Sequence, residues 1–227
     1  MAEQARTRIA DGFDQPVGKP NAEGYYMSRG FFTYHPGEDW NGIAGGNSDL
    51  GAPVYCIGNG VVTFARDARM GWGNVVLVRH IYTENGKLET VDSMYAHLDK
   101  ILVREGQQIT RGQQVGTIGT NRGMYTAHLH FEIRKNLNIG LNRSSFARDL
   151  TNYYRPGSFI ATRRKLRGAG RSAVVPVNTY DLRAFGNTAS RTRKTSESEK
   201  PRATATPTPS ERPRNFRVNR FDEMNSF

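Results

Sequence analysis

Three of the five histidines in this 227-residue sequence fall into two groups with the spacing of metal ligands. His35 is followed four positions later by Asp39, and one residue separates His128 from His130. In an extended chain, side chains at positions i, i+2 and i+4 share one face. Two imidazoles and one carboxylate leave one position of a tetrahedral zinc site open, as catalytic rather than structural zinc requires. We therefore predict that His35, Asp39 and His130 bind one Zn²⁺ ion.

Two further histidines are candidates for the proton transfers of a zinc hydrolase. Hydrolysis of an amide needs a group that takes a proton from water and donors that stabilise the oxyanion. His128 shares the predicted face of His130, and His97 lies in the segment 94–98. The spacing leaves open which of His97 and His128 is the base. Glu38 would face away from Asp39, so it is not a predicted ligand.

At these positions the sequence resembles the lysostaphin-like, LytM-type family of zinc metalloendopeptidases, which cut the peptide part of bacterial peptidoglycan. The signature H-x-G-x-D matches residues 35–39, and H-x-H matches residues 128–130. The likeness continues through residues 50–55, 60–62, 95–98 and 106–116, within a region of roughly residues 12–160. In that family, the residues that match His35, Asp39 and His130 bind zinc. Those that match His97 and His128 assist catalysis.

The resemblance defines the reaction more closely than the substrate. Members cut either glycine-rich bridges or the direct crosslinks between stem peptides. We favour stem-peptide crosslinks, because no recognisable bridge-binding module is appended. All five matched positions are intact, which favours an enzyme over the alternative, a non-catalytic module of the same fold that binds the wall or activates another hydrolase. Trp40 stands where the family often has a β-branched or apolar residue, next to the predicted cleft.

The pattern between these motifs predicts an all-β domain. Runs rich in β-branched and aromatic residues, such as residues 61–65 and 74–78, alternate with glycine-containing turns. We expect an antiparallel two-layer or partly closed β-sheet, and the resemblance implies a groove across it with zinc at its floor. Asn85 and Gly86 predict a two-residue hairpin turn. His80 is predicted at a strand end, residues 45–51 at the groove rim, and residues 144–150 in a short helical turn.

Charge and composition change towards the C-terminus. Residues 163–227 contain 15 Lys and Arg against 6 Asp and Glu, so they carry +9 of the net +11. After residue 187, a sequence rich in Thr, Ser, Pro and Arg lacks the apolar surface that would offset the entropy of ordering. We predict a flexible N-terminus (1–11), a LytM-type metallopeptidase domain (12–162), a poorly defined connection (163–186) and a disordered basic tail (187–227). Residues 173–177 are a weak candidate for an added edge strand.

Other classes of protein fit less well. The tail is predicted to be a solvated linker, with attachment to an anionic wall polymer or surface as the alternative. Specific nucleic-acid binding is not expected, because the tail lacks interleaved aromatic residues. Residues 103–112 resemble half of a biotinyl-type carrier domain, but no lysine stands at a hairpin tip. Cys56 is predicted to be a small buried apolar residue, because it lies in an apolar run.

The expected location follows from the substrate. Peptidoglycan peptides lie outside the cytoplasm, so we expect a wall-facing compartment, periplasmic or secreted. Residues 1–24 show no apolar signal-peptide core, and no apolar run is long enough for a transmembrane segment. We expect a monomer.

Overall fold

A computed structural model of the chain describes residues 3–139, 141, 150–168 and 170–180. The chain divides into two compact units, Met1–Thr188 and Ala189–Phe227, and every described residue belongs to the first. The tail predicted over residues 187–227 lies outside the described residues, as does the helical turn predicted over residues 144–150, except for its last residue.

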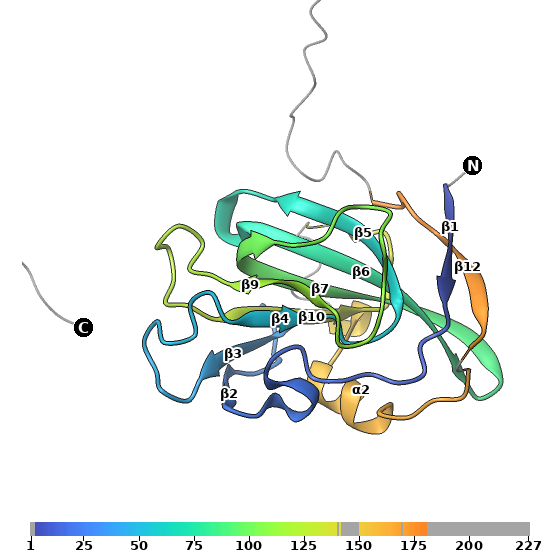
Figure 1. The fold of residues 1–227 in the computed structure, drawn as a ribbon, viewed down its shortest axis with the longest axis horizontal. Helices are drawn as coiled ribbons and strands as arrows, with labels where there is room; N and C mark the ends of the chain where they lie inside the picture. The colour runs from blue at the N-terminus through green and yellow to red at the C-terminus, as the bar shows by residue number, and fades with distance from the viewer. Residues whose placement is uncertain (1–2, 140, 142–149, 169, 181–227) are drawn as a thin grey trace, which may run out of the picture. The chain divides into compact units, whose positions relative to one another are not determined.

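The described residues form a mostly antiparallel β-structure with few helices, which confirms the predicted fold class (Figure 1). The main sheet has the strand order β2-β3-β10-β7-β6-β5-β8. These strands are β2 (Tyr25–Arg29), β3 (Glu38–Gly42), β10 (Leu129–Arg134), β7 (Lys87–Ile101), β6 (Asn74–Glu84), β5 (Gly60–Asp67) and β8 (Gln108–Ile109). In addition, β11 (Tyr153–Tyr154) pairs with β10, while β9 (Gln114–Ile118) joins β4 (Pro53–Tyr55) to β7.

The remaining elements are short. Strand β1 (Gln4–Arg8) pairs with β12 (Ser172–Pro176) in a separate two-stranded sheet. Single helical turns are η1 (Gly18–Ala22), η2 (Met70–Trp72) and η3 (Leu150–Asn152), and the one longer helix is α2 (Pro156–Thr162) among the residues described. No helix in this part of the chain is long and apolar enough to span a membrane.

A hydrophobic core covers each face of the main sheet. Neighbouring residues of one strand contribute to different cores, because they point to opposite sides. On β7, Tyr95 belongs to the larger hydrophobic core, which also contains Phe159 of α2. Met94 and Ala96, on either side of Tyr95, belong to a smaller core on the other face. Cys56 is fully buried in the larger core, as predicted. The functional side chains described below project on the face of Ala96.

The predicted hairpin at Asn85 and Gly86 is confirmed. Both residues have positive φ angles, 49° and 77°, and Glu84 pairs with Lys87 across the turn. The prediction that His80 ends its strand is wrong, because β6 continues four residues further, to Glu84. His80 is fully buried, and its two ring nitrogens contact the Asn59 carbonyl at 2.9 Å and Ser93 Oγ at 2.8 Å. Burial lowers the pKa of His80 to about 4.

The ends of the described chain are more ordered than the sequence predicted. Within the N-terminal segment expected to be flexible, β1 forms a regular ladder with β12, at one end of the fold in Figure 1. The connection expected over residues 163–186 therefore contains a strand, in the place of the candidate at residues 173–177. The buried pair of Arg79 and Asp92, 2.7 Å apart, holds this segment, because Arg79 also donates to the Pro176 carbonyl and to Thr179 Oγ1.

Candidate metal and catalytic site

One row of the main sheet carries the first part of the site. In the antiparallel ladders, His130 on β10 lies opposite Asp39 on β3 and opposite Ala96 on β7. Residues opposite each other in such ladders project from the same face with their Cβ atoms about 5 Å apart. Asp39 Oδ1 lies 2.8 Å from His130 Nδ1. Strand register, rather than proximity in sequence, brings this carboxylate and imidazole together.

His35 reaches the same place from a turn, not from a strand. The predicted shared face of His35 and Asp39 assumed that residues 35–39 are extended, but β3 begins only at Glu38. His35 closes a tight turn in which it exchanges two backbone hydrogen bonds with Phe32, and the intervening Tyr34 has a φ of 71°. His35 Nε2 lies 3.1 Å from Asp39 Oδ1. His35 and Asp39 therefore lie side by side because of this turn, and not because of alternation along a strand.

The glycine of the H-x-G-x-D signature allows this turn to approach β10. A Cβ atom on Gly37 would lie 2.6 Å from the Phe131 carbonyl oxygen and 2.9 Å from His130 Cε1. Contacts below 3.0 Å are not tolerated by carbon atoms, so any larger residue would displace the turn or the His130 ring. Gly37 thus sets the distance between His35 and His130. Glu38, which follows, is directed elsewhere and accepts a hydrogen bond from the Gly157 amide at 3.0 Å.

Three buried side chains, His35, Asp39 and His130, bring their ligand atoms to within 4.8 Å of one another. His35 Nδ1 donates to the Gly30 carbonyl at 2.7 Å, which leaves the lone pair on Nε2. That buried Nε2 has no hydrogen bond of acceptable geometry among the described residues, despite its closeness to Asp39. An orphaned buried nitrogen beside a second imidazole and a carboxylate fits the donor set of catalytic zinc. The three residues predicted as ligands are therefore suitably placed to hold one ion.

The second nitrogen of His130 contacts a residue that the sequence analysis missed. His130 Nε2 lies 2.9 Å from Glu132 Oε1, and Arg134 Nε donates to the other oxygen of Glu132 at 2.7 Å. Glu132 is fully buried. Carboxylates in this position fix the orientation and tautomer of a metal-binding histidine. Alternation along β10 could have identified Glu132, since it lies two residues after His130 on the same face.

The electrostatics of the cluster favour a cation. Burial alone would lower the pKa of His130, but the hydrogen bonds with Asp39 and Glu132 raise it to about 9. Burial would raise the pKa of Asp39, but the adjacent imidazoles of His130 and His35 hold it well below its usual value. Without a metal, the two carboxylates therefore retain a proton on His130. A metal ion that replaced this proton would meet the same negative charge.

His97 enters the site because β7 contains a bulge. Strict alternation would place His97 on the face of Tyr95, away from Ala96 and the ligand cluster. Between the pairs Val76–Tyr95 and Asn74–Leu98, however, β7 has one residue more than β6. His97 has a φ of 61°, and its ring lies 5.7 Å from that of His130, centroid to centroid. Bulges commonly re-aim a side chain beside an active site.

His97 and His128 present the same kind of atom to the cluster. His97 Nδ1 donates to the Trp72 carbonyl at 3.1 Å, and His128 Nδ1 donates to the Thr126 carbonyl at 2.8 Å. Because a carbonyl only accepts, Nδ1 carries the hydrogen in the neutral form of either ring, and the lone pair of that form is on Nε2. Burial, followed by the nearby His130 and His128, lowers the pKa of His97 to about 3, so His97 is neutral at pH 7. The two rings lie 4.9 Å apart.

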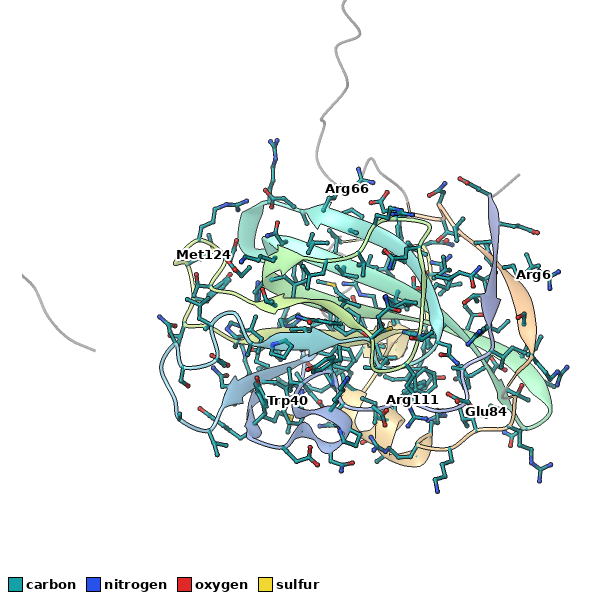
Figure 2. The ribbon with its side chains drawn as sticks, in the orientation of Figure 1. Arg6, Trp40, Arg66, Glu84, Arg111 and Met124 are labelled. Atoms are coloured by element: carbon teal, nitrogen blue, oxygen red, sulfur yellow. The ribbon has the colours of Figure 1, made fainter. Side chains whose placement is uncertain are left out.

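A cavity of about 130 Å³ opens over these five residues. Five further residues line it, none of them predicted as a site residue: Arg29, Pro36, Gly71, Trp72 and Tyr125. The loop at residues 45–51, predicted as a rim, does not line this cavity. Trp40, labelled in Figure 2, packs against the larger core, and alternation along β3 places it on the opposite face from Asp39. The cavity therefore places the imidazoles of His97 and His128 beside a three-ligand cluster, an arrangement that can activate water against a bound amide.

Comparison with known proteins places this site in context. The family described as Peptidase family M23 matches residues 34–140. The lipoprotein NlpD of Yersinia enterocolitica is 36% identical over 84 residues, which cover 37% of this chain and 78% of that protein. The peptidoglycan DD-endopeptidase ShyA of Vibrio cholerae is 38% identical over 84 residues, 37% of this chain and 18% of that protein.

Two further comparisons concern an activator and a solved structure. The murein hydrolase activator NlpD of Escherichia coli K12 is 33% identical over 103 residues, 43% of this chain and 25% of that protein. The crystal structure of a zinc-containing peptidase from Vibrio cholerae has 29% sequence identity and a TM-score of 0.42, covering 55% of this chain and 37% of that one. The chain thus spans a quarter or less of the length of the endopeptidase and of the activator.

Proposed function

The chain belongs to peptidase family M23, and on that premise we propose that it is a zinc-dependent endopeptidase that hydrolyses peptide bonds in bacterial peptidoglycan. One observation carries the proposal. The Nε2 lone pairs of His97 and His128 lie beside the cluster of His35, Asp39 and His130, within one cavity. A site that only bound a metal would not need these two additional imidazoles.

The side chains divide the work of amide hydrolysis. His35, Asp39 and His130 would hold the zinc ion, which when bound would supply a Lewis acid for the scissile carbonyl and lower the pKa of water. One of His97 and His128 accepts the proton of the attacking water at Nε2. The other, protonated at Nε2 by solvent, would donate a hydrogen bond to the developing oxyanion, and the first would pass its proton to the leaving amine nitrogen. Backbone carbonyls accept hydrogen bonds from Nδ1 of both rings, so that Nε2 of each ring is the nitrogen available for proton transfer.

The proposed substrate is the direct crosslink between stem peptides, as the sequence analysis favours. The similarity to the Vibrio protein named peptidoglycan DD-endopeptidase supports this choice. Similarity to that protein and to the NlpD lipoproteins also supports a place in the cell envelope. The proposed substrate lies there.

A second candidate function is the activation of another wall hydrolase. The similarity to the E. coli protein named murein hydrolase activator favours it. Activation would require no proton transfer by this chain. Replacing His97 or His128 would therefore leave activation intact, whereas the same replacement would lower hydrolysis by orders of magnitude.

The test is digestion of purified peptidoglycan by the zinc-loaded protein, with His128→Ala in parallel. Mass spectrometry of the released fragments identifies new amino and carboxyl ends. We expect new ends with the wild-type protein alone, at the D-alanyl bond of crosslinks. If the protein released no fragments from walls of several chemistries but stimulated a second hydrolase, the activator function would be favoured instead.

The basic tail retains its separate prediction. If residues 187–227 attach the protein to an anionic wall polymer, their deletion lowers the fraction that sediments with wall material, and added salt has the same effect on the full chain. Unchanged sedimentation after the deletion would leave the tail as a linker.

A further inference from the structure

Arg29 is brought to the metal cluster by a second β-bulge. In the ladder of β2 and β3, Met27 pairs with Trp40, and the next pair is Arg29 with Asp39. A regular ladder would place Ser28 opposite Asp39, so the extra residue moves Arg29 into that position. Arg29, Asp39 and His130 then form one row across three adjacent strands.

The Arg29 side chain is exposed and lines the cavity. Its guanidinium carbon lies 5.1 Å from the centre of the Phe32 ring, a cation–π contact that does not neutralise its charge. Among the described residues, no carboxylate forms an ion pair with Arg29. Within the part of the chain that the structure describes, Asp39 is the only carboxylate that lines the cavity, and its Oδ1 lies 2.8 Å from His130 Nδ1 and 3.1 Å from His35 Nε2.

The charge of the cavity follows from these contacts. The carboxylate of Asp39 offsets part of the charge of a divalent ion, and Arg29 adds one further positive charge close by. A cavity with this balance attracts anionic groups and disfavours cationic ones. Guanidinium groups bind carboxylates through two parallel hydrogen bonds, which adds geometric selectivity to the attraction.

We propose that Arg29 determines specificity by binding a free carboxylate on the residue that donates the scissile nitrogen. This inference rests on the endopeptidase function proposed above. A direct crosslink to a diaminodicarboxylate, such as meso-diaminopimelate, carries a carboxylate on the carbon bonded to that nitrogen. A crosslink to lysine, or one whose carboxylate is amidated, does not carry this charge. A bridge of glycines carries no side-chain carboxylate beside its internal bonds.

The test uses two crosslinked peptides that differ only at this group, D-alanyl-meso-diaminopimelate with a free or an amidated carboxylate. kcat/KM is measured for each with the wild type, Arg29→Gln, Arg29→Lys and the control Arg6→Gln. Arg6 is an exposed arginine on β1, at the end of the fold away from the loop that carries Met124 (Figure 2).

We expect the wild type and Arg6→Gln to prefer the free carboxylate by about tenfold or more, the size of one charge-assisted hydrogen bond. In Arg29→Gln the ratio falls towards 1, and Arg29→Lys keeps an intermediate ratio because it keeps the charge. An unchanged ratio in Arg29→Gln would overturn the proposal, even if kcat/KM fell equally for both substrates.

A binding measurement separates this inference from the proposed function. Zinc-loaded His128→Ala and the double variant His128→Ala/Arg29→Gln are titrated with the same two peptides by calorimetry. Selective binding that depends on Arg29, without cleavage by the wild type, supports the carboxylate site and contradicts the endopeptidase. Equal affinity for both peptides in His128→Ala contradicts the carboxylate site, whether or not the wild type cleaves them.

Discussion

Asp39 Oδ1 and His130 Nδ1 lie 2.8 Å apart although 91 residues separate the two positions in the chain. Their proximity results from the register of β3 against β10, in which the two residues are direct partners. A metal ion bound by both residues would therefore connect β3 to β10. Variants of residues that hold these ligands in place should therefore change zinc affinity as well as turnover.

Glu132 is predicted to strengthen zinc binding through His130. Glu132→Ala should lower zinc affinity about 10- to 100-fold, because His130 Nε2 loses its hydrogen-bond acceptor. Glu132→Gln should lose less, since the amide oxygen still accepts this bond. The dissociation constant is measured by competition with a chromophoric chelator.

A control for Glu132 is Glu105→Gln, since Glu105 belongs to an exposed ion pair with Arg66. Melting temperatures of the metal-free variants show whether loss of the buried partner of Arg134 unfolds the domain. Equal zinc affinity in folded Glu132→Ala and in the wild type would refute this role.

Gly37→Ala should damage the site through crowding. The added methyl would lie 2.6 Å from the Phe131 carbonyl oxygen, and relief of such a contact costs about 1–3 kcal/mol. We expect a lower free energy of unfolding and weaker zinc binding, both measured in the same preparation. Gly30→Ala is the matched control, because its Cβ would meet nothing closer than 3.9 Å. Similar behaviour of the two variants would show that the turn is not confined.

His80 should make the fold less stable at acidic pH. Its pKa is about 4 in the folded protein against 6.5 in a model peptide, because burial disfavours the charged ring. Between these pH values the unfolded chain binds the extra proton, so stability is fully present above pH 6.5 and is lost as the pH falls towards 4. The difference corresponds to roughly 3 kcal/mol for this fully buried side chain.

The measurement for His80 is urea unfolding with EDTA at several pH values between 4 and 7.5, for the wild type and His80→Asn. EDTA removes the separate effect of acid on metal binding. The asparagine amide can still donate to the Asn59 carbonyl but does not titrate. The free energy of unfolding should fall more steeply with acid in the wild type. Parallel curves would mean that His80 contributes nothing to the pH dependence.

The fold class and the hairpin were predictable because they depend on local patterns. Alternation of apolar residues marks β-strands, and Asn85 and Gly86 adopt the positive φ angles of a tight turn at little cost. The placement of His80 was wrong because the apolar run ends before the strand does. Strand β6 continues to Glu84, and its pairing with β7 depends on contacts that a single segment does not reveal.

The site residues were chosen by spacing and resemblance, but spacing does not explain how they meet. His35 comes from a turn, and two bulges bring His97 and Arg29 to the cavity against the alternation of their strands. A bulge depends on the pairing of two distant segments, so it cannot be read from either segment alone. Arg29 was missed for this reason, whereas Glu132 follows the ordinary alternation of β10.

The most direct test of the account measures bound zinc and turnover together in single variants. His97→Ala and His128→Ala should each retain one zinc per chain and lose about 10²- to 10⁴-fold in turnover of crosslinked peptides, the usual size of general acid–base catalysis. His35→Ala, made in parallel, should lose the zinc itself. Full turnover in either His97→Ala or His128→Ala, or loss of their zinc, would contradict the division of these five residues into ligands and proton-transfer groups.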